Sequence, residues 1–127
     1  MRTIVINMQS TLVSRALERV LRQEMKDCNP IISERPEDTA DQCRLFRPYA
    51  LLMEVTGYMP WQLEQRLKIC TAVHRQLPDC KFIFSVDENA DPELADRVTQ
   101  CKKDGQIDAF IYNSTSERYL AAILDSV

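Results

Sequence analysis

The sequence contains five short runs of apolar residues, separated by longer segments with helical periodicity. This alternation is the feature that most strongly limits the possible folds of the chain. The runs are 3–6, 31–33, 48–55, 81–86 and 107–112. They are rich in β-branched and aromatic residues, as is typical of strands that are buried on both faces. Alternation of such strands with helices predicts right-handed crossovers and a parallel sheet that has helices on both sides.

The segments between these runs show the periodicity of helices with one apolar face. Residues 10–24 form the clearest helix, with Ser10 or Thr11 as its N-cap. The side chains of this helix predicted to face inward are Leu12, Val13, Ala16, Leu17, Val20 and Leu21. In the helix after Trp61, those predicted to face inward are Leu63, Leu67, Cys70, Val73 and Leu77. Those predicted to face solvent in the same helix are Gln62, Gln65, Arg66 and Lys68.

Residues with special backbone preferences mark where the other helices begin and end. Pro36 suits the first turn of a helix, and Asp91 followed by Pro92 predicts an N-cap and a first helical position. Gly105 suits the left-handed residue that ends this helix. Residues 114–117, Ser-Thr-Ser-Glu, match a capping box and predict the start of the last helix.

The second run is the weakest strand of the five. Asn29-Pro30 indicates a turn before it, and residues 31–33 are too few and too polar at their end for a central strand. The run 48–55 suits the centre of the sheet. We therefore predict an α/β three-layer sandwich of the flavodoxin type, with a five-stranded parallel sheet in the order 2-1-3-4-5, formed by one domain over residues 1–127.

Composition narrows the classes of function. The chain has 16 basic and 19 acidic residues, a net charge of -3, and no apolar stretch near the ~20 residues of a membrane span. We therefore expect a cytoplasmic protein with no direct nucleic-acid partner and no membrane insertion. The five cysteines lack a Cys-x-x-Cys pair and suit reduced, packed thiols. The pair Cys70 and His74 is too small a ligand set for a metal, and two glycines provide no phosphate-binding loop, so we expect no metal or cofactor.

The residues that follow or end several of the predicted strands lie at the edge where open parallel sheets bind ligands. They are Asn7, Met8, Glu54, Thr56, Ser85, Asp87 and Tyr112. The run from Pro48 to Val55, PYALLMEV, resembles the third strand of a response-regulator receiver domain, with Glu54 at the position of the phospho-accepting aspartate. The length and the fivefold alternation extend this resemblance over the whole chain. The resemblance implies the receiver fold and a role in two-component signal transduction.

The resemblance also implies site residues that this sequence replaces. The two acidic Mg²⁺ ligands of receivers correspond to Asn7 and Met8, the lysine after the fifth strand to Tyr112, and the switch aromatic to Ala109. Only the hydroxyl after the fourth strand is kept, as Ser85. Mg²⁺ prefers carboxylate ligands, and phosphoryl transfer depends on nearby positive charge. The resemblance is therefore to a degenerate receiver, or pseudo-receiver, and we expect no phosphorylation and no catalysis.

The role of Glu54 has more than one interpretation at this level. Aligning Met59-Pro60 with the Met-Pro of the family would move Thr56 to the acceptor position. In the preferred alignment Glu54 is at the acceptor position. It is then either a permanent charge that mimics the phosphorylated state or a solvated carboxylate at a strand end. The acidic loop after the fourth strand contains Asp87, Glu88, Asp91 and Glu93. We expect these carboxylates to be solvated and to provide the negative charge that a helix N-terminus favours, and the alternative is a weak cation site or a docking surface.

Two classes of function compete. The first is a non-catalytic regulatory module that acts through protein contacts, including a homodimer, on the face formed by the fourth helix, fifth strand and fifth helix that the resemblance implies. Residues predicted on this face are Arg97, Lys102, Tyr112, Arg118 and Tyr119. The alternative is a flavin or small-molecule protein that uses the strand-end crevice. The residues available to it are Ser10, Thr11, Glu54, Thr56 and Ser85.

Overall fold

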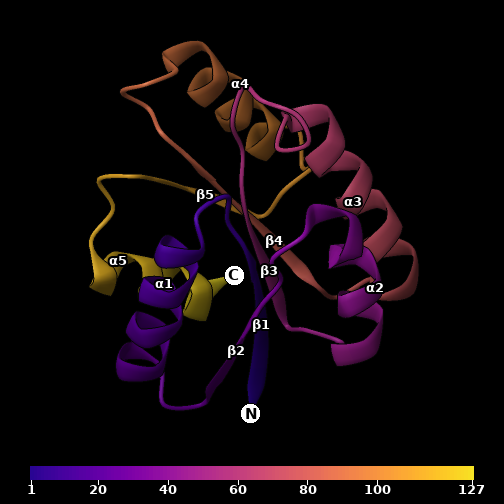
Figure 1. Cartoon of the computed structure of the whole chain (residues 1–127), viewed down its shortest axis with the longest axis vertical. Coiled ribbons are helices and arrows are strands. Elements are labelled where there is room, and N and C mark those ends of the chain that lie inside the picture. The colour runs from indigo at the N-terminus through magenta and orange to yellow at the C-terminus, as the bar shows by residue number, and fades with distance from the viewer.

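The computed structural model describes all 127 residues and alternates five strands with five helices (Figure 1). The strands are β1 (Arg2–Asn7), β2 (Cys28–Ile32), β3 (Ala50–Glu54), β4 (Lys81–Val86) and β5 (Ala109–Tyr112). The helices are α1 (Thr11–Glu24), α2 (Pro36–Phe46), α3 (Leu63–Gln76), α4 (Pro92–Lys103) and α5 (Glu117–Ser126). The predicted number, type and order of the elements are confirmed.

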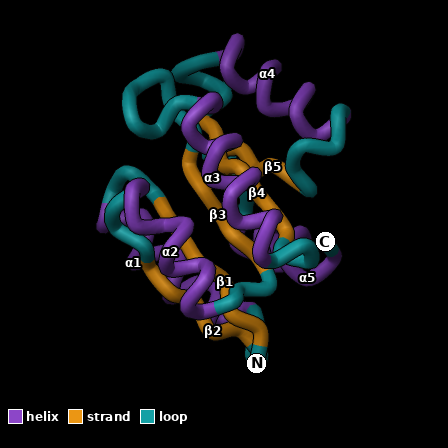
Figure 2. The backbone as a smooth tube through the Cα atoms, turned by 90° about the vertical axis from the view of Figure 1, so that its right-hand side faces the viewer, coloured by secondary structure: helices purple, strands orange, loops and turns teal.

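All five strands form one parallel sheet in the predicted order β2-β1-β3-β4-β5. Helices α1 and α5 pack on one face of the sheet, and α2, α3 and α4 pack on the other (Figures 1 and 2). Successive residues of β3 enter the two cores in turn, so Leu51 and Met53 lie in one core and Leu52 lies in the other. The flavodoxin-like three-layer sandwich is confirmed, and Glu54 ends its central strand.

β2 is longer than predicted, because Asn29 and Pro30 belong to the strand and not to a turn. The strand spans Cys28–Ile32, and Pro30 stands opposite Ile4 of β1. Proline has no N–H to donate, but an edge strand needs donors on one side only. The structure therefore confirms the edge position and corrects the predicted turn.

The stripe of α1 predicted to face inward is confirmed only in part: Leu21 is buried and Leu17 packs against the same core. Ser14 and Leu21 are buried, whereas the predicted inward residues Leu12, Val13 and Ala16 are exposed. The buried stripe has the spacing i and i+7 expected for one helix face. Ser14 was not predicted to face inward because its side chain is polar, yet it is buried.

β5 and α5 begin later than predicted. β5 starts at Ala109, because Asp108 ends the preceding turn and its carboxylate accepts the N–H of Phe82 at 2.8 Å. The N-cap of α5 is Ser116, whose Oγ accepts the N–H of Tyr119 at 3.2 Å. Ser114, the predicted cap, instead donates its hydroxyl to Glu88 at 2.9 Å. The capping box predicted over residues 114–117 is therefore wrong.

The other predicted helix ends are confirmed. Pro36 and Pro92 occupy the first turns of α2 and α4, and the Asp91 side chain accepts the N–H of Leu94 at 3.1 Å. Gly105 follows α4 with a φ of 79°, a conformation that glycine adopts without strain. None of the helices is both long enough and apolar enough to cross a membrane.

Candidate functional site

The carboxyl ends of β1 and β3 meet at the edge of the sheet where the site was predicted. Asn7 ends β1 and is completely buried, and its side-chain amide donates to the carbonyl of Ser33, just after β2, at 2.6 Å. The Ser33 hydroxyl in turn bonds to that of Thr39 in α2 at 2.8 Å. Asn7 therefore joins the ends of β1 and β2 and leaves its side-chain oxygen directed to a third partner.

That third partner is Arg66 of α3, which the sequence interpretation placed on the solvent face. Its side chain is 0% exposed. The guanidinium donates from Nε to the carbonyl of Glu54 at 2.7 Å, and from its two terminal nitrogens to Asn7 Oδ1 at 2.6 Å and Asn7 O at 3.1 Å. Arg66 therefore connects the ends of the two central strands, β1 and β3, to helix α3.

The helical spacing explains why Arg66 points inward. Leu63, Arg66, Cys70 and Val73 are the buried residues of α3, and their spacing of three or four places them on one face. The prediction assigned Arg66 to solvent because arginine is rarely buried without partners. The detectable signal was its position, three residues after Leu63 and four before Cys70.

Burial disfavours the charge of Arg66. It lowers the pKa of Arg66 to about 10, although the negative charge of Glu54 acts in the opposite direction. The guanidinium therefore stays protonated at neutral pH. Its hydrogen-bond partners are two carbonyls and an amide oxygen, and the Trp61 ring lies 4.5 Å from its central carbon. A positive charge is thus held inside the site by neutral acceptors and an aromatic face.

The carboxylate of Glu54 lies at the rim of this network. Its Oε1 accepts the backbone N–H of Gln9, in the β1–α1 loop, at 2.7 Å. The carboxylate forms no ion pair with Arg66, so the two charges interact through space without direct contact. The Glu54 side chain therefore holds the β1–α1 loop against the end of β3, while its backbone carbonyl accepts a hydrogen bond from Arg66.

The other predicted site residues divide between the two faces of the sheet. Ser85 is paired with Glu54 in the register of β3 and β4, and Met8 is buried in the core under α1 and α5. Tyr112 pairs with Val86 on β5, two strands from β3, and packs against the opposite core. The structure thus gathers Asn7, Glu54 and Ser85 at the strand ends and leaves Tyr112 apart.

Two of the hydroxyls considered for a flavin or small-molecule site, those of Ser10 and Thr56, have local hydrogen-bond partners. Ser10 caps α1 by accepting the N–H of Val13 at 3.3 Å, which confirms it as the N-cap. Thr56 Oγ1 accepts the N–H of Tyr58 at 3.1 Å, and its own N–H donates to the carbonyl of Trp61. Both residues stabilise turns next to the site.

The acidic loop after β4 is also occupied by local hydrogen bonds. Asp87 Oδ1 accepts the N–H groups of Asn89 and Ala90, each at 3.1 Å. Glu88 accepts the N–H of Asn113 and the Ser114 hydroxyl, and so joins this loop to the one after β5. Its carboxylates therefore stabilise two loops beside the site.

An open groove of about 660 Å³ runs along the face formed by α4, β5 and α5. Of the residues predicted on this face, Lys102, Tyr112 and Tyr119 line the groove. Arg97 points toward α3 and forms an ion pair with Glu64, and Arg118 lines a separate depression near the start of β1. We name this feature the α4–β5–α5 groove.

No family model matches the sequence, and no curated protein matches it. The fold is nevertheless that of response-regulator receiver domains, which it matches over nearly its whole length. A receiver domain protein from Clostridium thermocellum has a TM-score of 0.80 at 7% identity, covering 98% of this chain and 92% of that one.

Two other solved structures show the same likeness. A DNA-binding response regulator of the LuxR family from Staphylococcus aureus has a TM-score of 0.78 at 11% identity, with 98% of this chain and 97% of that one covered. A CheY-like receiver domain protein from Methanospirillum hungatei has a TM-score of 0.77 at 14% identity, with 98% and 91% covered. At such low sequence identities, the structural likeness establishes a shared fold and nothing more specific.

Proposed function

We propose that this chain is a non-catalytic signalling module of receiver fold that works without phosphorylation, through contacts with a protein partner. The observation that carries this proposal is the position of Arg66. Its guanidinium fills the interior of the strand-end site and is hydrogen-bonded to the ends of both central strands.

The arrangement opposes two requirements of phosphoryl transfer, a bound metal ion and a free acceptor carboxylate. A Mg²⁺ ion needs oxygen ligands, but Asn7 Oδ1 is already bonded to Arg66 and Met8 offers a buried thioether. A buried positive charge next to this position also repels a divalent cation. Glu54 extends one methylene further than aspartate, and its carboxylate is bonded to the N–H of Gln9. The site therefore holds a permanent internal cation where a metal and a phosphoryl group would otherwise meet.

The same observation favours one interpretation of Glu54. Its carboxylate contributes negative charge near a buried arginine and an acceptor for the β1–α1 loop. Both are fixed parts of the folded chain. We therefore infer that Glu54 and Arg66 together hold the strand ends in a single state that needs no chemical modification.

The α4–β5–α5 groove is the proposed contact surface for a partner. Tyr119 is 59% exposed beside the groove lining of Tyr112, Ile123 and Val127, and Lys102 adds a positive charge. Exposed tyrosine next to apolar side chains is characteristic of protein contact surfaces. The partner is either a different protein or a second copy of this chain.

Phosphorylation is tested by treating the purified chain with acetyl phosphate and Mg²⁺ and measuring the intact mass. We expect no added phosphoryl group, whereas a receiver domain with both acidic ligands and the acceptor aspartate, treated in parallel, gains one. Stoichiometric labelling that disappears in Glu54→Gln would overturn the proposal.

Partner binding is tested by affinity capture from a lysate of the source organism, together with sedimentation of the purified chain. A Lys102→Glu, Tyr119→Ala double variant should lose the captured protein or the self-association. The matched control is Arg15→Glu, Leu12→Ala on the exposed surface of α1, which should retain it. Equal binding by both variants would contradict the proposed surface.

A further inference from the structure

A second cavity lies at the opposite, amino end of the sheet. It is bounded by the second half of α3, the turn before β4, the first residues of β4, and the turn between α4 and β5, and its volume is about 500 Å³. This volume lies within the ~300–1,000 Å³ range of small-molecule sites. We name it the α3–β4 pocket.

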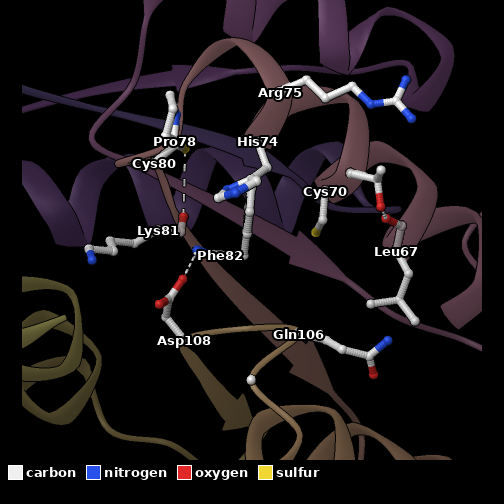
Figure 3. A pocket seen from close by; sticks show the side chains of 12 residues that line it. Leu67, Cys70, His74, Arg75, Pro78, Cys80, Lys81, Phe82, Gln106 and Asp108 are labelled. Carbon is white, nitrogen blue, oxygen red and sulfur yellow. Dashed lines mark hydrogen bonds between the residues drawn. The ribbon is translucent and has the colours of Figure 1, made fainter.

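The lining of this pocket combines apolar and polar side chains. Leu67, Cys70 and Phe82 supply apolar surface. Burial raises the pKa of Cys70 well above its ordinary value and that of Cys80 to about 12, so both thiols are neutral at physiological pH. In Figure 3, Cys70 and His74 approach the pocket from α3, while Gln106 and Asp108 approach it from the facing turn. The lining therefore offers apolar surface and hydrogen-bonding groups side by side.

The charge around the opening of the pocket is positive. Arg75 and Lys81 are the two cationic residues of the lining, and neither forms an ion pair. Figure 3 shows their side chains extended outward on opposite sides of the opening. Asp108 is the single acid, and one of its oxygens accepts the N–H of Phe82 at 2.8 Å. This local excess of positive charge contrasts with the net charge of -3 on the chain.

We propose that the α3–β4 pocket binds a small organic anion, with an apolar, planar body against Leu67 and Phe82 and a carboxylate or phosphate near Arg75. The anionic group lies on the side of the opening away from Asp108. Arg75 and Lys81 are long, flexible side chains, so they turn toward an anion without any movement of the backbone.

The position of Asp108 links this pocket to the surface proposed for partner binding. Asp108 lines the α3–β4 pocket and also lines the α4–β5–α5 groove. A ligand in the pocket therefore lies against a residue that also borders the groove. The consequence for partner binding rests on the proposed function, whereas the binding site itself does not.

The proposal is tested by titrating the full chain with naphthalene-2-carboxylate and, separately, with the neutral naphthalene-2-carboxamide, following backbone amide chemical shifts. Saturable shifts are expected for residues 67–75, 80–82 and 105–108. The carboxylate should bind about fivefold more tightly than the amide, the size expected for one or two solvent-exposed charge interactions. Naphthyl phosphate in place of the carboxylate shows which anionic group is preferred.

Three variants make the test specific. Arg75→Glu should remove the preference for the carboxylate, and Gln106→Trp should weaken both probes by filling the pocket. The matched control is Arg19→Glu, an exposed arginine on α1 that lines neither cavity, and it should bind like the original chain. Absence of saturable binding, equal affinity for the two probes, shifts confined to the groove, or an equal loss in Arg19→Glu would each overturn the proposal. The titration uses no partner and no phosphodonor, so its failure is distinct from failure of the proposed function.

Discussion

Helix α3 borders both ends of the sheet, and the two ends are filled in opposite ways. Near its start, α3 places Arg66 inside the carboxyl end, where three hydrogen bonds tie it to β1 and β3. Near its end, the same helix leaves a pocket between His74 and the turn that contains Asp108 (Figure 3). The place where a fold usually binds ligands can thus be closed by one side chain, while an open cavity lies at the other end.

The largest expected effect comes from breaking the closed end. Arg66→Met removes the hydrogen bonds that the guanidinium donates to the carbonyls of Asn7 and Glu54 and to the Asn7 amide oxygen in a buried site. We expect the free energy of unfolding to fall by about 3 kcal/mol, measured by urea denaturation. Arg75→Met, an exposed arginine on the same helix, is the control and should change it by less than about 0.5 kcal/mol. Similar values for both would mean that the buried network adds no stability.

Asn7→Leu tests the other half of the same network. Leucine has a similar size but cannot donate to Ser33 or accept from Arg66, so a carbonyl and a guanidinium N–H lose partners. The expected loss is about 2 kcal/mol by the same measurement. Asn113→Leu, on an exposed loop, is the control, and a comparable loss there would count against the buried bridge.

The buried thiols predict how stability depends on pH. Burial raises the pKa of both Cys43 and Cys80 from 9.0 to about 12. Between these values the unfolded chain releases thiol protons that the folded chain keeps, so the free energy of unfolding falls as pH rises above 9.0. At about pH 10 the loss is about 1.4 kcal/mol for each thiol.

The measurement is urea denaturation at about pH 8 and about pH 10 for the original chain and for Cys43→Ala. The variant should lose less stability between the two conditions. An identical loss in both proteins would show that the Cys43 thiol ionises equally well in the folded state.

Glu54→Gln separates the charge of Glu54 from its hydrogen bond. The glutamine oxygen still accepts the N–H of Gln9, but the negative charge near Arg66 is removed. We expect a loss of about 0.5–1 kcal/mol at low ionic strength and a smaller loss at high salt, because salt screens the partly exposed carboxylate. A salt-independent loss would indicate that the hydrogen bond, and not the charge, was altered.

The smallest effect is expected at the open end. Gln106→Trp places a ring over an existing cavity with no buried polar group left unpaired, so the free energy of unfolding should change by less than about 0.5 kcal/mol. Thermal denaturation checks this. A loss as large as that for Arg66→Met would erase the contrast between the two ends.

The architecture was predictable because the strand segments are mostly apolar runs and the segments between them have helical spacing. The order of the sheet followed from the weakness of the second strand and the length of the apolar run 48–55. Pro30 was misread, since proline signals a turn in most contexts but is tolerated at an edge. Ser116 replaced Ser114 as the cap because Glu88, from a distant loop, binds the Ser114 hydroxyl.

The candidate site was only partly predictable, because some of its contacts join residues that are distant in the sequence. Asn7, Glu54 and Ser85 were placed correctly at the strand ends by the position of each strand in the chain. Arg66 was assigned to solvent, because its burial depends on acceptors that β1 and β3 bring together only in the folded state. The residues that line the α3–β4 pocket come from three separate segments, so no local sequence pattern predicts it.

Arg66 is part of the chain, so the positive charge in the strand-end site does not have to be supplied from solution. A metal ion or a phosphodonor reaches a site in proportion to its concentration in the surroundings, whereas a side chain reaches its site in every folded copy. The proposed signalling state is then present in the same fraction of molecules at all times. Changes in the supply of a metal ion or a phosphodonor would then leave this proposed state unchanged.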